Sequence, residues 1–286
     1  MNIMNYTKRD VVTVTPGHSI DDAISLMEER NIHHLVVVDG DLLAGMLSDR
    51  DILLSTGWML AIERRVRTPQ GVHIIGPTTV GQIMSRWPVA LSAADDARIA
   101  ALLFVERRIA AAPVLQGGRL AGIVTESDLL NWLLDLATPG TAAYAMLRAE
   151  VRGAMSGRLT SVAPDTPIGD VVDIFRRRRI RHVPVVLEGR LIGIISDRDV
   201  RRALGWANIR DMQAQEEGRL FEGPERAEQI MKTELLTLTP TETMREALKQ
   251  MLDRRVHSAL IVQEGRVVGI LTETDFVKLI ANEELL

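Results

Sequence analysis

The sequence has no cysteine among its 286 residues, so it can form no disulfide, no thiolate nucleophile and no cysteine-ligated metal centre. It also lacks any run of about 18 uncharged apolar residues, the length that a membrane helix needs. Its first residues lack the long apolar stretch of a secretory signal. We therefore expect a cytoplasmic protein without a membrane anchor.

Neither sign of charge dominates the chain. The formal net charge of −4 gives no global attraction to nucleic acid or to anionic membranes, so any anion site must be built locally. Catalytic motifs are absent as well, since there is no His-Glu-x-x-His, no P-loop and no glycine-rich dinucleotide fingerprint. We therefore expect a non-catalytic protein with no catalytic cofactor and no metal site.

What the chain does contain is one short pattern in four copies. Each copy has a glycine, two apolar residues, a Ser or Thr, two further residues and an Asp. The copies are Gly45–Asp51, Gly122–Asp128, Gly193–Asp199 and Gly269–Asp275. Each places a hydroxyl and a carboxylate at a predicted strand-to-helix junction, where an anion and a sugar diol can be held together. A single copy would favour a simple helix cap, but four copies favour a ligand site.

The spacing of the copies indicates a duplication inside a duplication. Their glycines are 77, 71 and 76 residues apart, which is typical of a repeated supersecondary unit. The first and third copies share Ser-Asp-Arg-Asp, whereas the second and fourth read Thr-Glu-Ser-Asp and Thr-Glu-Thr-Asp. We therefore predict two modules, residues 1–140 and 148–286, joined near the turn-forming segment 138–141.

Each repeat has the pattern of a strand, a helix, two strands joined by a glycine turn, and a second helix. In the first repeat Ser19 is a predicted N-cap, and Ile20, Ile24 and Met27 recur on one helical face. One such unit leaves an apolar face exposed, so we expect the repeats to pair within each module, with pseudo-twofold symmetry, in a flat disc. The predicted class is α+β, with four β-α-β-β-α repeats at about residues 6–56, 79–137, 150–205 and 226–283.

With these motifs the sequence resembles the cystathionine-β-synthase (CBS) domain family, in the tandem-pair arrangement called a Bateman module. Four such repeats without a catalytic domain resemble the gamma subunit of AMP-activated protein kinase and free-standing prokaryotic CBS proteins. The resemblance implies that the motif hydroxyl contacts a phosphate and that the motif Asp binds both ribose hydroxyls. The implied phosphate contacts are Ser48, Thr125, Ser196 and Thr272, and the implied ribose ligands are Asp51, Asp128, Asp199 and Asp275. The chemistry agrees, because an ionised carboxylate offers only acceptors to the two donors of a vicinal diol.

A second set of positions lies eleven and twelve residues before each motif glycine. It reads His33-His34, Ala110-Ala111, Arg181-His182 and His257-Ser258. By resemblance, its basic residues point at the phosphates of the ligand; these are His33, His34, Arg181, His182 and His257. The alternative is that the imidazoles are half-buried on a strand and bonded to neighbours. The second repeat has no basic residue here, so a polyphosphate in it would need cations from another repeat.

Two sets of arginines need separate interpretation. Arg50 and Arg198 stand one residue before the motif Asp, where each suits a phosphate contact or a salt bridge to the adjacent domain. The basic run 175–181 is the one feature that favours nucleic acid. Matching arginine pairs at 107–108 and 254–255 end the same predicted helix in other repeats, where they suit the helix dipole. We therefore expect no nucleic acid partner.

The sequence thus predicts a regulatory protein that binds adenine nucleotides, AMP, ADP or ATP, in clefts between paired repeats, with Mg²⁺ as a candidate companion. S-adenosylmethionine, NAD and cyclic di-AMP share the adenosine part and are alternative ligands, and a scaffold subunit with vestigial sites is a further alternative. A second copy of the chain and an unidentified target protein are candidate partners. Because a sensor must differ between two states, we expect the module interface and the long segments 58–79 and 206–227 to move.

Overall fold

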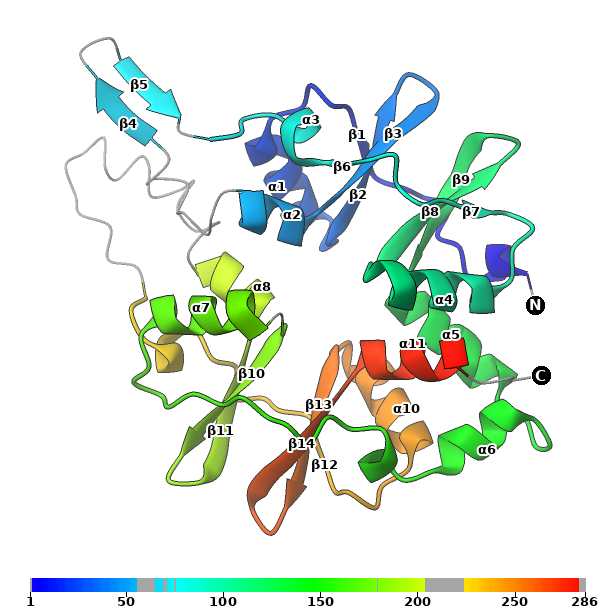
Figure 1. Cartoon of the computed structure of the whole chain (residues 1–286), viewed down its shortest axis with the longest axis vertical. Helices are drawn as coiled ribbons and strands as arrows, with labels where there is room; N and C mark the ends of the chain where they lie inside the picture. Colours follow the sequence, from blue (N-terminus) through cyan, green and yellow to red (C-terminus); the bar gives the residue numbers. More distant parts are fainter. Residues whose placement is uncertain are drawn as a thin grey trace.

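The computed structural model describes residues 2–55, 65–68, 71–74, 76–178, 180–203 and 224–282. Four copies of one small unit of helices and strands are arranged around a common centre and form a ring (Figure 1). Within the described ranges, no helix combines the length and the hydropathy that crossing a membrane requires.

Each repeat has a helix, a two-stranded hairpin and a second helix, as predicted, and three of the four repeats also begin with the predicted short strand. Repeat 1 contains β1 (Thr13–Val14), α1 (Ile20–Glu29), β2 (His34–Asp39), β3 (Leu42–Ser48) and α2 (Asp49–Ser55). Repeat 2 contains β7 (Leu91–Ser92), α4 (Ala97–Arg107), β8 (Ala111–Gln116), β9 (Arg119–Thr125) and α5 (Glu126–Leu136). Repeat 3 contains α7 (Ile168–Arg178), β10 (His182–Leu187), β11 (Arg190–Ser196) and α8 (Asp197–Arg201). Repeat 4 contains β12 (Thr237–Leu238), α10 (Met244–Arg254), β13 (Ser258–Gln263), β14 (Arg266–Thr272) and α11 (Glu273–Asn282).

The strands of a repeat pair in one order. The first strand runs parallel to the second, and the second runs antiparallel to the third, with a register irregularity in the middle of each hairpin. In repeat 3 the first strand is reduced to one parallel bridge between Val162 and Val185. The third strand therefore always ends at the motif hydroxyl, directly before the second helix.

Shorter elements connect the repeats. They are η1 (Ile3–Asn5), β4 (Arg65–Thr68), β5 (Gly71–Ile74), α3 (Val80–Ile83), β6 (Ser85–Arg86), α6 (Ala142–Arg148), η2 (Val151–Gly153) and η4 (Ala227–Gln229). Of the segments that we predicted to move, 58–79 and 206–227, only β4, β5 and short flanking stretches are described. The remainder lies outside the described residues, so its motion stays a prediction.

Local sequence explains where the helices begin. Ser19 caps α1 as predicted, because its side chain accepts a hydrogen bond from the backbone N–H of Asp22 at 2.9 Å. Ile20, Ile24 and Met27 form the buried face of this helix, also as predicted.

Within the basic run 175–181, Arg176, Arg177 and Arg178 form the last turn of α7 and are exposed. Two of them form ion pairs with Asp173 of the same helix. The equivalent helices α4 and α10 also end at an arginine, Arg107 and Arg254. The run therefore follows the helix-end pattern that the sequence predicted.

A short segment ahead of each repeat crosses to the third strand of its partner, which pairs repeat 1 with repeat 2 and repeat 3 with repeat 4. β6, ahead of repeat 2, pairs with β3, and Lys8, Ser156 and Lys232 make the equivalent bridges elsewhere. The motif glycines lie directly against these crossings. A Cβ at Gly122 would stand 2.6 Å from the carbonyl oxygen of Lys8, and a Cβ at the other three would meet a methionine sulfur at 2.3–2.7 Å. The motif glycine is thus required by the close approach of two chain segments.

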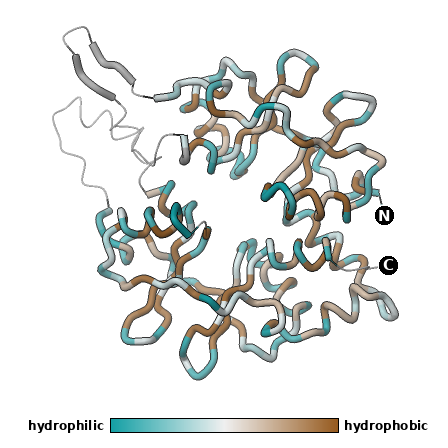
Figure 2. The backbone as a smooth tube through the Cα atoms, in the orientation of Figure 1, coloured by the Kyte–Doolittle hydropathy of each residue, from teal (hydrophilic) through white to brown (hydrophobic). Residues whose placement is uncertain are grey.

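The ring is held by an apolar interface on one side. A single core joins repeats 2 and 4, and includes Phe104 and Leu133 of repeat 2 with Leu248 and Phe276 of repeat 4. Repeats 1 and 3 have separate cores around α1 and α7, and no buried apolar cluster among the described residues joins these two repeats. Hydrophobic positions, brown in Figure 2, run through the strands and through the helices near the two termini.

Candidate functional site

The motif Ser or Thr and the motif Asp form one closed unit in every repeat. In repeat 1, Oδ2 of Asp51 accepts hydrogen bonds from the backbone N–H of Ser48 at 2.8 Å and from its hydroxyl at 2.6 Å. The same two bonds, at 2.5–2.9 Å, join Thr125 to Asp128, Ser196 to Asp199 and Thr272 to Asp275. One carboxylate oxygen is therefore used locally, and Oδ1 is the oxygen left for another group.

In three repeats that second oxygen is paired with a lysine. The pairs are Lys8–Asp128 at 3.2 Å, Lys232–Asp199 at 2.8 Å and Lys278–Asp275 at 3.1 Å. Lys8 and Lys232 belong to the crossing segments, so the partner repeat contributes each of them. None of these lysines was predicted from the sequence as a site residue, although Lys8 and Lys232 each stand five residues before the first strand of a repeat.

Asp51 differs from the other three motif carboxylates. Among the described residues no cation lies within ion-pair distance of it. The pKa of Asp51 is raised, because the effect of burial is larger than that of the hydrogen bonds from Ser48, which act in the opposite direction. Repeat 1 therefore has the motif carboxylate with the least electrostatic compensation.

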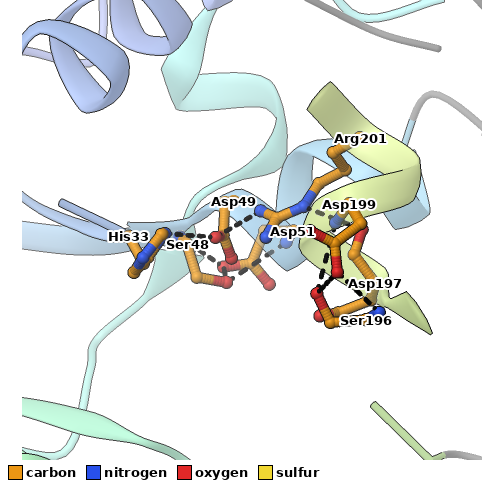
Figure 3. Close-up of polar contacts among 8 residues, drawn as sticks. All are labelled: His33, Ser48, Asp49, Asp51, Ser196, Asp197, Asp199 and Arg201. Atoms are coloured by element: carbon orange, nitrogen blue, oxygen red, sulfur yellow. Dashed lines mark hydrogen bonds and ion pairs between the residues drawn. The ribbon is translucent and has the colours of Figure 1, made fainter. Parts of the chain in front are cut away.

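The residue after the motif hydroxyl is acidic in all four repeats, and it too was not predicted from the sequence as a site residue. In repeat 1 this residue is Asp49, which is buried. Its Oδ2 lies 2.9 Å from Nδ1 of His33 and forms an ion pair with Arg201 of repeat 3 (Figure 3). Burial alone would raise the pKa of Asp49, but the hydrogen bond with His33 and the charge of Arg201 hold it well below its ordinary value.

Repeats 2 and 4 exchange hydrogen bonds across the module boundary. Ser127 donates its hydroxyl to Oε1 of Glu273 at 2.6 Å, and Thr274 donates its hydroxyl to Oε1 of Glu126 at 2.9 Å. Nδ1 of His257 also lies 2.8 Å from Oε2 of Glu273. Burial raises the pKa of Glu126. Burial is also the largest single effect on Glu273, but the bond and charge of His257, the bond from Ser127 and the charge of Arg198 together outweigh it and lower the pKa of Glu273. The first turns of α5 and α11 are therefore joined by hydrogen bonds between repeats 2 and 4.

The first residue of the predicted basic pair faces these carboxylates. His33 and His257 lie edge to face, with ring centroids 6.3 Å apart, although they belong to repeats 1 and 4. Arg181 of repeat 3 lies 3.9 Å from Glu126 of repeat 2. His33 of repeat 1 thus meets His257 of repeat 4, and Arg181 of repeat 3 meets Glu126 of repeat 2.

The second residue of the pair has a different environment. Burial lowers the pKa of His34 to about 4 and that of His182 to about 3, so both imidazoles are neutral near pH 7. As phosphate contacts they would act as neutral hydrogen-bond donors rather than as cations.

Arg50 and Arg198 occupy equivalent motif positions in repeats 1 and 3. Both side chains are half-buried, and neither makes a hydrogen bond or an ion pair within the part of the chain that the structure describes. Burial lowers the pKa of both guanidinium groups, and a neighbouring arginine adds to this, Arg181 for Arg50 and Arg201 for Arg198. Of the two roles predicted for these arginines, the salt bridge to the adjacent domain is not formed among the described residues.

The family of this chain follows from comparison with known proteins. A family model described as "CBS domain" matches four ranges, residues 3–55, 80–135, 149–205 and 227–282. These ranges cover most of the chain, so the chain belongs to the CBS domain family, as its motifs predicted.

Two comparisons extend over the whole length. The chain is 27% identical to the uncharacterized protein MJ1225 of Methanocaldococcus jannaschii, over 96% of each chain. The crystal structure of MJ1225, described as a proposed archaeal homolog of g-AMPK, has a TM-score of 0.77 at 23% identity and covers 98% of this chain and 100% of that one. An uncharacterized conserved protein from Pyrococcus horikoshii has a TM-score of 0.63 at 18% identity, with the same coverage. The arrangement of four CBS repeats in two Bateman modules is thus a known fold.

Proposed function

We propose that this chain is a non-catalytic regulatory protein that senses adenine nucleotides, AMP, ADP or ATP, in the clefts between its paired repeats. The observation that carries the proposal is the Ser/Thr–Asp unit, which recurs in all four repeats with one carboxylate oxygen directed away from the local cap. A carboxylate that needs donors suits the two hydroxyls of a ribose. The relative MJ1225, which carries the description of a g-AMPK homolog, is consistent with this function.

In this proposal each motif residue has a distinct role. Asp51, Asp128, Asp199 and Asp275 bind ribose, and Ser48, Thr125, Ser196 and Thr272 contact phosphate. Further phosphate contacts come from Arg50, Arg198, His33, His34, Arg181, His182 and His257. Where a lysine is paired with the motif Asp, the lysine must move aside for the sugar. The lysine side chain is more than half exposed and can return to water, and the ribose hydroxyls replace the donor that the buried carboxylate loses.

The charges at the centre favour nucleotides over other adenosine ligands. S-adenosylmethionine has no phosphate and would leave Arg50 and Arg198 unpaired, whereas NAD and cyclic di-AMP would engage them. The described residues contain no group of three or more acidic or histidine side chains placed to hold a metal, so a Mg²⁺ companion would be held through the phosphates. A scaffold with vestigial sites is less consistent with four intact Ser/Thr–Asp units.

Isothermal titration calorimetry tests the proposal directly. AMP, ADP and ATP, each with and without Mg²⁺, should release or absorb heat with saturable binding, and S-adenosylmethionine should compete weakly. Absence of binding for all three nucleotides at millimolar concentration would contradict the proposal. Stronger binding of S-adenosylmethionine than of AMP would favour the alternative ligand class.

A further inference from the structure

The first helix of repeat 2 exposes apolar side chains on its solvent side. Ile99 and Leu102 of α4 are 46% and 38% exposed, and they lie one turn apart, opposite the buried side of the helix. Two further exposed apolar side chains, Trp87 and Val89, stand just ahead of this repeat. Four of the six large hydrophobic side chains that are exposed among the described residues therefore belong to the start of repeat 2.

The other three repeats provide an internal comparison, because their first helices begin at equivalent residues. The two positions that are apolar in α4 are polar in each of the other helices. The equivalents are Asp22 and Ser25 in α1, Asp170 and Asp173 in α7, and Glu246 and Lys249 in α10. The fold of a repeat thus does not require apolar residues at these positions, which points to a contact outside the repeat.

Charged residues of opposite sign flank the two apolar side chains of α4. Arg98 directly precedes Ile99, and Glu106 lies one turn after Leu102. Neither charged side chain makes a hydrogen bond or an ion pair within the part of the chain that the structure describes, and Nε of Arg98 is buried without a partner. The solvent side of α4 therefore has an apolar centre, a cation toward one end and an anion toward the other.

This order of charges selects one mode of packing between two copies of α4. A second copy packed parallel to the first would place arginine against arginine and glutamate against glutamate. A twofold axis at Leu102 makes the two helices antiparallel and places Arg98 against Glu106, because each lies four residues from Leu102, about 6 Å along the helix. The ion pair then forms twice, and the apolar side chains cover each other between the two pairs.

We propose that α4 is a self-association surface, on which a second copy of this chain packs its own α4 antiparallel, with Arg98 paired to Glu106 of the second copy. The other sides of α4 pack against α5 and α11 (Figure 1), so the second copy displaces no contact within the ring. One helix face buries less than the about 800 Å² per partner of a stable complex, so the dimer is weak and reversible. The inference is independent of the proposed nucleotide function.

Sedimentation velocity of the full chain over a wide range of concentrations measures the association. The unaltered protein should show a reversible monomer–dimer equilibrium. Leu102→Ser, which introduces the residue type of α1 at this position, should raise the dissociation constant about tenfold or more, because it removes the central apolar contact. The matched control, Lys249→Ser, changes the equivalent exposed position of α10 and should leave the constant unchanged. Both substitutions are at exposed positions, so both variants should keep the melting temperature of the unaltered protein.

Charge reversal tests the pairing itself. Arg98→Glu places glutamate against glutamate, and Glu106→Arg places arginine against arginine, so each variant alone should be monomeric where the unaltered chain dimerises. An equal mixture of the two variants should dimerise, because every glutamate then faces an arginine of the other variant. The chain that carries both substitutions should also dimerise, since both pairs are restored with reversed polarity.

The outcomes decide the proposal without reference to nucleotides. A chain that is monomeric at every concentration, or an association that Leu102→Ser does not weaken, would overturn it. A mixture of the two charge variants that associates no better than either variant alone would overturn it as well. Dimers with the expected charge pattern would support the α4 surface even in a protein that binds no nucleotide.

Discussion

At the scale of single residues, the motif Asp has two roles that experiment can separate. It completes a helix cap with the Ser or Thr before it, and we propose that its other oxygen binds ribose. The chain offers a matched control, because Thr243 and Glu246 form the same type of cap at α10, away from any motif. The role of the motif Asp in the helix cap can therefore be measured separately from its proposed role in ribose binding.

We predict that Asp199→Ala removes one nucleotide site and costs about 1 kcal/mol of stability from the lost cap. Glu246→Ala, which removes an exposed cap partner, should leave the number of sites unchanged. Calorimetric stoichiometry measures the first effect and urea denaturation the second. An unchanged stoichiometry in Asp199→Ala would contradict the ribose role of this residue.

A second prediction concerns His34 and His182, whose pKa values are lowered by burial to about 4 and about 3. In the unfolded chain a histidine has a pKa of about 6.5, so the unfolded state binds more protons at acidic pH. The folded state should therefore lose stability as the pH falls from about 6.5 toward these values, by about 1–3 kcal/mol per histidine. Urea denaturation across pH 4–7 measures this slope.

His182→Gln should flatten the pH dependence of stability between pH 6.5 and 4. His18→Gln changes an exposed histidine and serves as the control, which should keep the slope of the unaltered protein. A slope that His182→Gln does not reduce would show that other groups dominate acid unfolding.

The motif glycine shows what could and what could not be predicted from the sequence. Its fourfold recurrence identified the repeat and the family, yet the reason for glycine lies in the crossing of Lys8 or a methionine over the strand. Such a contact joins residues over a hundred positions apart at Gly122, so no local pattern could reveal it. We predict that Gly122→Ala costs about 1–3 kcal/mol by overpacking against the Lys8 backbone.

The control for this substitution is Gly169→Ala in α7, where an added Cβ meets nothing within 4 Å. Alanine is favoured over glycine inside a helix by about 1 kcal/mol, so this variant should be equally or more stable. Comparable destabilisation of both variants in urea would contradict the crossing argument.

At the scale of helices and strands, the sequence predicted what depends on near neighbours. The cap at Ser19, the apolar face of α1 and the two strands of each hairpin follow from periodicity and turn residues, and the structure confirms them. The partners at the centre could not be predicted in this way. Arg201 meets Asp49 only because two helices from different modules face each other, and their sequence separation carries no signal of this contact.

The crossed hydrogen bonds between α5 and α11 provide a prediction at this scale. Thr274→Ala should destabilise the protein more than Ser127→Ala does. Glu126, the partner of Thr274, would keep only Arg181 at 3.9 Å, whereas Glu273 would keep His257 at 2.8 Å. A buried carboxylate without a partner costs about 1–3 kcal/mol or more. Urea denaturation of the two single variants measures the difference, and equal losses would contradict the unequal compensation.

At the scale of the whole molecule, the shared core of repeats 2 and 4 makes the two modules interdependent. Helix α5 buries Leu129, Leu130, Trp132 and Leu133, because it packs against its own repeat and against α10 and α11 of the other module. Removing the second module would expose one of these faces to water. Exposed apolar patches of more than a few hundred Å² mark surfaces that associate.

We therefore predict that residues 2–140, produced alone, self-associate instead of remaining monomeric, and that residues 148–286 do the same through α10 and α11. Mixing the two fragments should form a one-to-one complex, since only that complex restores both the core and the bond from Thr274 to Glu126. Analytical ultracentrifugation over a range of concentrations measures the association.

The double variant Leu130→Asp and Leu133→Asp, which places charges on the buried side of α5, should abolish the complex. A fragment 2–140 that is monomeric at every concentration and as resistant to urea as the full chain would contradict the role of the shared core of repeats 2 and 4 in joining the two modules.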